Sequence, residues 1–332
     1  MQQIAKKKLY ICSTPYHLLY AMVREANNKN LTFLYLSSYD EKIIDYYKEI
    51  VSKTNFENFK IIIRKRNRLN DFLYYGLIED KIEYKKIVID NNIDELFIFP
   101  WNVNNLYIHA NHFFKKHDRI NFIEDGITAS QVPKKNKYYS FFKKRLYGLS
   151  TNESYKKVLK IYVNDKKKYI GSNLSNEIIK EEKFEEIFNE VSKNQKEKLF
   201  KFFNNYQENN MNESDFKKSV IILTQPLSED GYETEHNKIE IYREIVKEYI
   251  SKDYFVYFKR HPRDLSEYVF KDRKRIHELN KFLPAELLSV NNMKFDYAIG
   301  VCTSAINNVN ATTKINLKPD YFYDNSNKGL KK

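Results

Sequence analysis

The chain of 332 residues is poor in glycine and proline, with seven of each, and it has two cysteines and one tryptophan. So few turn-forming residues argue against a loop-rich sandwich and favour regular helices and strands. Cys12 and Cys302 both lie in apolar, strand-like runs and do not support a disulfide framework, so a reducing compartment is expected. No stretch has the length and apolar character of a signal peptide or a membrane span, which predicts a cytoplasmic protein.

The charge is strongly one-sided, with a net charge of +13, while 42% of the residues are hydrophobic and 15% aromatic. The apolar content excludes a disordered chain, and the length allows one large domain or two ordinary ones. A basic surface suits nucleic acid, an anionic membrane or an anionic substrate, and it also serves solubility alone. The basic aromatic run at 134–145 is the one stretch that resembles a nucleic-acid contact, and no RNA-binding or DNA-binding motif accompanies it.

Apolar runs alternate with helix-periodic segments in two blocks of the sequence. Such alternation predicts parallel sheets with both faces covered. The expected strands are 8–14, 31–36, 59–63, 95–100, 119–123, 219–226, 253–258, 275–279 and 295–302, and the expected helices are 16–25, 40–51, 105–116, 238–250 and 283–288. The resulting domain hypothesis is an α/β domain over 1–130, a helical connecting segment over 131–215 and a second α/β domain over 216–332.

His261 stands out because it follows the expected strand 253–258, which Pro262 must end. Ligands of open α/β sheets collect outside the carboxyl ends of the strands. Lys259, Arg260 and Arg263 surround this histidine with positive charge. The stretch therefore predicts a place that holds an anion and can move a proton.

Carboxylates follow strands in both blocks. Glu124, Asp125 and Gly126 end the strand at 119–123, where a carboxylate beside a flexible glycine suits a general base. Asp230, before Gly231, offers the same chemistry from the second block. An acidic residue next to glycine is also an ordinary turn, so the motif alone leaves both readings open.

Thr303 and Ser304 follow the expected strand at 295–302 and open an apparent helix. Hydroxyls and free amides at a helix N-terminus can bind phosphate or carboxylate, although Ser and Thr also serve as ordinary N-caps. His109 and His112 have the spacing of a metal pair, but no carboxylate or thiol lies at ligand spacing. No metal site and no cofactor are expected.

Taken in order, these motifs resemble the bacterial sialyltransferases of glycosyltransferase family 52, the lipooligosaccharide sialyltransferase family. The shared features are an acidic-acidic-glycine motif at Glu124-Asp125-Gly126, a His-Pro motif at His261-Pro262, a Pro-x-Glu motif at Pro284-Ala285-Glu286 and the pair Thr303-Ser304. The opening run at 11–19 is also similar to that family. The resemblance implies two Rossmann-like domains facing a central cleft, the GT-B arrangement, with acceptor binding in the first and CMP binding in the second.

Carried over to this chain, the resemblance makes His261 the group that contacts the CMP phosphate and supports its departure as an acid. It places Lys259, Pro262, Glu286, Thr303 and Ser304 at the donor, with Glu286 on the ribose hydroxyls. Further candidate contacts are Glu124, Gly126, Gln225 and Arg263. The acidic motif nominates Asp125 as the base, whereas a carboxylate after the first strand of the second block, matched by Asp230, is a rival; Glu229 also stays open.

The resulting hypothesis is an inverting, metal-independent sialyltransferase. It would move sialic acid from CMP-sialic acid to a galactose-terminated acceptor of a bacterial surface glycan, a lipooligosaccharide or a capsule. The alternatives are a GT-B transferase using another nucleotide sugar, with a glucosyl or hexosaminyl donor, and a basic nucleic-acid-binding protein. Expected partners are the donor and the glycan acceptor, not nucleic acid, with a homodimer as a further candidate. The run at 134–145 is a candidate contact with the cytoplasmic membrane surface.

Overall fold

The chain divides into two compact units, Met1–Gln195 and Lys196–Lys332, each with a parallel sheet of its own. The computed structural model describes residues 6–53, 56–67, 75–99, 113–114, 116–124, 158–169, 175–204, 218–289, 293–303 and 305–317. Among these residues, no helix combines the length and apolar character needed to cross a bilayer.

The first unit is built on a parallel sheet with the strand order β3-β2-β1-β4-β5-β6-β7. The strands are β1 (Lys8–Cys12), β2 (Thr32–Ser38), β3 (Phe59–Lys65), β4 (Glu95–Ile98), β5 (Ile120–Ile123), β6 (Val158–Val163) and β7 (Ile179–Glu181). Helical connections follow β1 and β2, as parallel neighbours require. The order reverses at β1, which has β2 on one side and β4 on the other.

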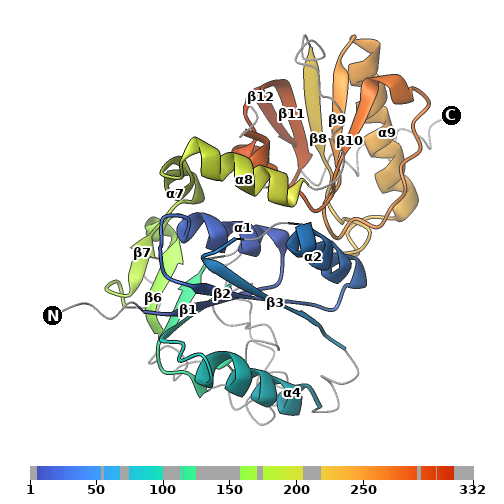
Figure 1. The fold of residues 1–332 in the computed structure, drawn as a ribbon. Helices are drawn as coiled ribbons and strands as arrows, with labels where there is room; N and C mark the ends of the chain where they lie inside the picture. Colours follow the sequence, from blue (N-terminus) through green and yellow to red (C-terminus); the bar gives the residue numbers. More distant parts are fainter. Residues whose placement is uncertain are drawn as a thin grey trace. The chain divides into compact units, whose positions relative to one another are not determined.

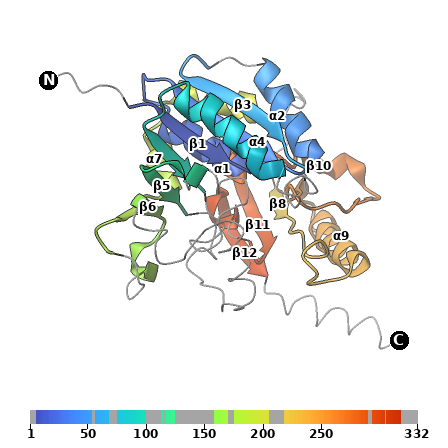
Figure 2. The same ribbon diagram turned by 90° about the horizontal axis from the view of Figure 1, so that it is seen from below.

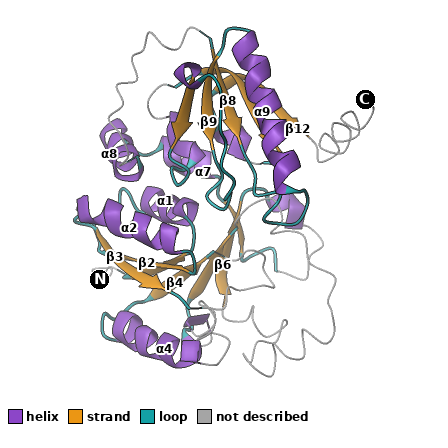
Figure 3. Ribbon diagram, turned by 90° about the vertical axis from the view of Figure 1, so that its right-hand side faces the viewer, coloured by secondary structure: helices purple, strands orange, loops and turns teal. Residues whose placement is uncertain are grey.

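Helices cover both faces of this sheet. α1 (Pro15–Arg24) and α2 (Glu41–Lys53) lie on one face, and α4 (Tyr75–Tyr84) lies on the other (Figures 1 and 3). Figure 2 looks onto the α4 side. α1 starts where the sequence predicts, because the Thr14 hydroxyl caps it and Pro15 occupies its first turn. Short helical turns, η1 (Lys85–Ile89) and η3 (Lys166–Tyr169), and the helices α7 (Phe184–Asn189) and α8 (Lys193–Phe203) complete the described elements before residue 204.

The second unit repeats the order of the first five strands of the first sheet as β10-β9-β8-β11-β12, again all parallel. Its strands are β8 (Ser219–Leu223), β9 (Phe255–Lys259), β10 (Ile276–Leu279), β11 (Phe295–Val301) and β12 (Ala311–Leu317). β8 is the switch strand, with β9 on one side and β11 on the other. Ligands of such sheets bind outside the carboxyl ends at that point.

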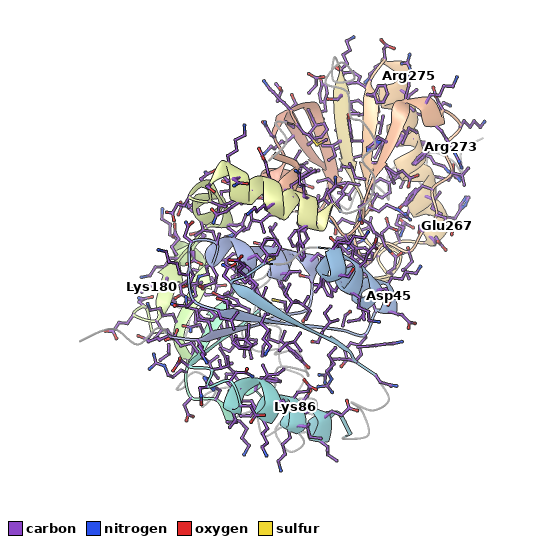
Figure 4. All side chains as sticks on the ribbon, in the orientation of Figure 1. Asp45, Lys86, Lys180, Glu267, Arg273 and Arg275 are labelled. Atoms are coloured by element: carbon purple, nitrogen blue, oxygen red, sulfur yellow. The ribbon has the colours of Figure 1, made fainter. Side chains whose placement is uncertain are left out.

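One long helix, α9 (Glu235–Ser251), packs along the second sheet (Figures 1 and 3). Its inner face places Tyr242, Ile245 and Tyr249 against Val256 and Phe258 of β9. Short 3₁₀ turns complete the unit: η5 (Arg273–Arg275), η6 (Ala285–Ser289) and η7 (Ala305–Asn308). Charged side chains such as Glu267 and Arg273 project from its outer surface (Figure 4). The two halves of the sequence therefore form two Rossmann-like units, which confirms the predicted α/β class.

Some expectations differ from the structure, and others fall on residues that the structure does not describe. The segment at 131–215 is not a purely helical connector, because it contains β6 and β7, which extend the first sheet. The helix expected after Thr303 is only η7, a four-residue 3₁₀ turn. The strand β12 has no counterpart among the predicted elements. Most of the predicted helix at 105–116 lies outside the described residues, as does the basic aromatic run at 134–145.

Candidate functional site: the carboxyl edge of the second sheet

His261 begins a tight turn just beyond the carboxyl end of β9. The Asp264 amide donates to the His261 carbonyl at 2.9 Å, and Pro262 takes the position of this β-turn at which proline is favoured. The His261 amide also donates to Thr224 Oγ1 at 3.0 Å, which ties the turn to the end of β8. The predicted strand end is confirmed, and the His-Pro pair forms part of a hydrogen-bonded turn.

The local bonds define the protonation of His261. Its Nδ1 accepts a hydrogen bond from the Arg263 amide at 3.1 Å, so the neutral ring carries its proton on Nε2. Burial lowers the pKa of His261 to about 3. The charges of Arg263 and Lys259 add to this shift, and those of Asp230 and Glu229 oppose it. In the free protein this histidine is therefore a neutral hydrogen-bond donor at neutral pH.

Asp230 is paired with Arg263 in the same turn. The Arg263 guanidinium makes two bonds to the carboxylate, at 2.7 Å and 3.0 Å, both on the surface. The Asp230 amide donates to the Pro226 carbonyl at 2.9 Å, and Gly231 follows with a φ of 76° that favours glycine. The rival candidate base and the His261 turn are thus in direct contact through Arg263.

Lys259 and Glu286 form a buried pair of ionisable groups near the end of β9. Lys259 Nζ donates to the carbonyls of Arg260 at 3.1 Å and Lys281 at 2.9 Å. Burial lowers the pKa of Lys259 to about 7, with the charge of Glu286 opposing the shift. Burial likewise raises the pKa of Glu286, although a bond from Asn308 Nδ2 at 2.8 Å favours its ionised form.

Thr303 lies just beyond β11, on the other side of β8. Its hydroxyl accepts from the amide of Ala305, the first residue of η7, at 3.2 Å. Asn316 of β12 holds the Thr303 backbone through bonds of 3.2 Å and 3.0 Å. A Cβ on Gly300 would lie 2.4 Å from the Thr303 methyl carbon, so the close approach of strand and turn requires glycine there.

Glu124 has a structural environment in the first unit. It is 7% exposed, and its two carboxylate oxygens accept from the Asn164 amide at 2.7 Å and the Tyr169 hydroxyl at 2.8 Å. These bonds link the end of β5 to the segment after β6. Asp125 and Gly126, together with Ser304 of the second unit, lie outside the described residues.

A buried charge network lies behind the His261 turn. Lys238 of α9 and Asp264 are both fully buried, and Lys238 Nζ lies 2.9 Å from Asp264 Oδ1 and 2.8 Å from Glu229 Oε2. The other oxygen of Asp264 accepts from the Thr224 hydroxyl. The sequence did not identify Lys238 or Thr224 as site residues. The available signal was a lysine at a core-facing position of an amphipathic helix, because lysine is almost never fully buried unless paired.

The described residues of the second unit therefore bring most of the predicted groups to one edge. Because β9 and β11 flank β8 as parallel neighbours, Lys259, Thr224 and Thr303 all lie at the carboxyl ends of adjacent strands. Gln225 also lies at this edge, and its backbone amide donates to the Tyr242 hydroxyl at 3.0 Å. Glu286 joins them through its charge interaction with Lys259.

Metal ligands do not cluster in the part of the chain that the structure describes, where no three His, Cys, Asp or Glu side chains form a group that could hold an ion. His109 and His112 lie outside that part. Metal independence stays a prediction.

Comparison with known proteins gives the family. Residues 8–316 match the family described as Alpha-2,8-polysialyltransferase (POLYST). The chain belongs to this family. The match confirms the prediction of a glycosyltransferase, and specifically a sialyltransferase-type one, at the level of the family. Membership of glycosyltransferase family 52 itself stays a prediction.

Solved structures share the fold at low sequence identity. One is an α/β-galactoside α-2,3-sialyltransferase from Photobacterium phosphoreum, with a TM-score of 0.50 and 16% identity over 95% of this chain and 91% of that one. Another is the UDP-GlcNAc 2-epimerase of Neisseria meningitidis, with a TM-score of 0.51 and 12% identity over 98% and 91% of the two chains. These similarities concern the fold alone and support the GT-B type of two Rossmann-like domains.

A shorter similarity links the chain to an uncharacterized protein of Haemophilus influenzae (strain ATCC 51907 / DSM 11121 / KW20 / Rd). The two are 36% identical over 87 residues, which is 26% of this chain and 27% of that protein. The match thus spans about a quarter of the relative's length and carries no functional argument.

Proposed function

We propose that this protein transfers sialic acid from CMP-sialic acid to a glycan acceptor, with inversion at the anomeric carbon and without a metal ion. The observation that carries the proposal is the His261 turn at the carboxyl edge of the second sheet. There a neutral imidazole with its proton on Nε2 stands beside Arg263 and the buried Lys259. The family match supports a sialyltransferase, and the donor and acceptor are our inference.

Positive charge at the carboxyl edge of the sheet would help CMP to leave. As the bond between the anomeric carbon and the phosphate oxygen breaks, CMP gains negative charge on its phosphate. Preorganised donors at that position stabilise the developing charge in the transition state. His261 would donate from Nε2 and Lys259 from its ammonium, so the protein's own donors fill the role that a divalent ion has elsewhere.

A low pKa favours hydrogen bonding over proton transfer as the first role of His261 in the free protein. Binding of an anionic phosphate beside the ring would favour its protonated form, because opposite charges stabilise each other. His261 would then be able to pass a proton to the departing phosphate. Glu286, at the Lys259 end of the edge, would accept hydrogen bonds from the ribose hydroxyls.

The acceptor hydroxyl must lose its proton as its oxygen attacks the anomeric carbon from the face opposite CMP. We assign this base role to Asp230, and Asp125 is its rival. The two bonds from Arg263 hold the Asp230 carboxylate in a fixed orientation. A carboxylate has about four lone-pair sites, so the paired group can still accept the proton of an incoming hydroxyl.

The sequence resemblance and the family description favour two different glycan acceptors. The sequence resemblance favours a galactose-terminated glycan of a bacterial surface polysaccharide. The family description favours instead a glycan that already ends in sialic acid, extended through an α-2,8 linkage. Both acceptors present hydroxyls on a sugar ring, so the chemistry proposed for Asp230 is the same.

The test is an incubation of the protein with CMP-sialic acid and either lactose or sialyllactose, with and without EDTA. Release of CMP together with the mass gain of one sialic acid on the acceptor is the expected result, unchanged by EDTA. The acceptor that gains mass decides between the two glycans. Transfer from a UDP-sugar and not from CMP-sialic acid would replace the proposal with the alternative donor class.

A further inference from the structure

Lys238 occupies an unusual position for a lysine. It lies on the inner face of α9, one turn before Tyr242, and both side chains are fully buried. Its ammonium has three carboxylate oxygens within reach: Glu229 Oε1 at 3.0 Å, Glu229 Oε2 at 2.8 Å and Asp264 Oδ1 at 2.9 Å. An ammonium has three protons to donate, so these contacts can satisfy it completely.

The two carboxylates come from two different loops of the candidate site. Glu229 precedes Asp230 in the loop after β8, and Asp264 closes the His261 turn after β9. We propose that Lys238 is a positioning residue that holds the Asp230 loop and the His261 turn in register at the site of sialyl transfer. This inference rests on the proposed function, because it gives Lys238 its role through those two residues.

The connection from Lys238 to His261 runs through short hydrogen bonds. Asp264 Oδ2 accepts from the Thr224 hydroxyl, whose oxygen in turn accepts from the His261 amide at 3.0 Å. Asp264 also accepts from the Tyr268 hydroxyl at 3.0 Å and from the Ser266 amide at 3.1 Å. The His261 turn is therefore linked through Thr224 to the Asp264 carboxylate, which is paired with the Lys238 ammonium.

The connection from Lys238 to Asp230 runs through Glu229, the residue before Asp230 in the sequence. Glu229 accepts the Leu265 amide at 2.7 Å, which joins the two loops directly. Burial opposes ionisation of Glu229, but bonds from Lys238 and from the Leu265 amide outweigh it and hold its pKa below its usual value. These engaged oxygens also leave Glu229 poorly placed to act as the base, a role that its sequence position left open.

Stability alone is a weak reason to keep such a network. A buried ion pair can often be replaced by apolar residues of similar size without loss of stability, whereas removing one partner is costly. The ion triad does what apolar packing does not, because it sets the direction of hydrogen bonds to two loops. Displacement of a reacting group by about 1 Å can cost on the order of 10² in rate.

The experiment compares Lys238→Met with Lys247→Met. Both lysines belong to α9, but Lys247 is exposed, so its replacement controls for a lost positive charge on the helix. In Lys238→Met we expect kcat to fall by about 10- to 100-fold, with the KM for CMP-sialic acid little changed. Lys238→Arg keeps the cation and should restore part of kcat, while Lys247→Met should match the wild type.

Asp264→Asn is the second variant, because it keeps the side-chain shape and removes the charge. Its control is Glu267→Gln in the same segment, where Glu267 is exposed (Figure 4). A fall in kcat confined to Asp264→Asn supports the proposal. A folded Lys238→Met or Asp264→Asn with wild-type kcat overturns it, and so does a result in which neither variant folds, because the network would then serve stability alone.

A measurement without turnover separates this inference from the proposed function. Nitrogen-15 NMR of the histidine ring reports whether Nδ1 of His261 stays unprotonated and hydrogen-bonded. We expect the wild type and Lys247→Met to show the Nε2–H form, and Lys238→Met to show a mixture of both neutral forms. If the wild type transfers no sialic acid, the proposed function fails, and an unchanged ring spectrum in Lys238→Met overturns the positioning role separately.

Discussion

The two terminal guanidinium nitrogens of Arg263 donate to the two carboxylate oxygens of Asp230 at 2.7 Å and 3.0 Å. Arg263 belongs to the His261 turn, and its amide also donates to the imidazole Nδ1. One residue therefore orients both the proposed phosphate contact and the proposed base. The pair is largely exposed, so its contribution to stability is small, and its importance is geometric.

Replacing His261 by alanine should lower turnover by on the order of 10² or more, because a charge-stabilising donor to the leaving phosphate is lost. CMP release from CMP-sialic acid in the presence of acceptor measures the effect. His236→Ala is the control, since His236 is an exposed histidine of α9. Near-normal turnover in His261→Ala would remove this residue from the mechanism.

Asp230→Asn and Asp125→Asn should behave differently. With Asp230 as the base, its amide variant should lose turnover by roughly 10² or more while binding donor normally, because an amide cannot take the acceptor proton. Asp125→Asn should then stay active. Kinetics of both variants, with circular dichroism to check folding, decide between them. The opposite pattern assigns the base to Asp125, and two active variants exclude both.

Arg263→Met should weaken the site in two ways. It removes the two bonds to Asp230, so the carboxylate loses its fixed orientation, and it removes a positive charge near the donor phosphate. We expect kcat/KM to fall by about 10- to 100-fold. Arg263→Lys should recover only a part, because lysine cannot bind a carboxylate through a planar fork. Full activity in both variants would show that Asp230 needs no such support.

His261 should stay neutral in the free protein across the range of about pH 5 to 8 in which an unperturbed histidine titrates. Its pKa is lowered to about 3 by burial and by Arg263 and Lys259. The unfolded chain therefore binds this proton more readily than the folded protein does, so the contribution of His261 to stability falls as pH drops from about 6.5 towards 3. An NMR titration checks this, and a midpoint near 6.5 would contradict it.

Lys259 should make donor binding sensitive to alkaline pH. Burial lowers its pKa to about 7, so the free protein loses this positive charge as pH rises through that value, although an exposed lysine would keep it. Affinity for CMP should therefore decrease above about pH 7, and calorimetric titration with CMP at several pH values measures it. In Lys259→Met the affinity should be lower than in the wild type at pH values below the Lys259 pKa, and the decrease above that pKa should disappear.

The sequence predicted much of the fold because parallel strands buried on both faces appear as uninterrupted apolar runs. β8 and β9 were found in this way, and so was the strand end before His261. β6 and β12 were not, because each has exposed residues within the strand, and in β12 all five residues from Thr312 to Asn316 are exposed. Strand preference depends on sheet context, which local patterns do not contain.

The sequence by itself determined two α/β blocks, the position of His261 at a strand end and the surplus of positive charge near it. These features follow from local periodicity and from residue order. The tertiary structure decided the contacts between loops. These are the ion pair of Arg263 with Asp230, the hydrogen bond from the His261 amide to Thr224, and the ion pairs of Lys238 with Glu229 and Asp264. Such contacts depend on the strand order that brings β8 beside β9, because hydrogen bonds and burial act between neighbours in space, not in sequence.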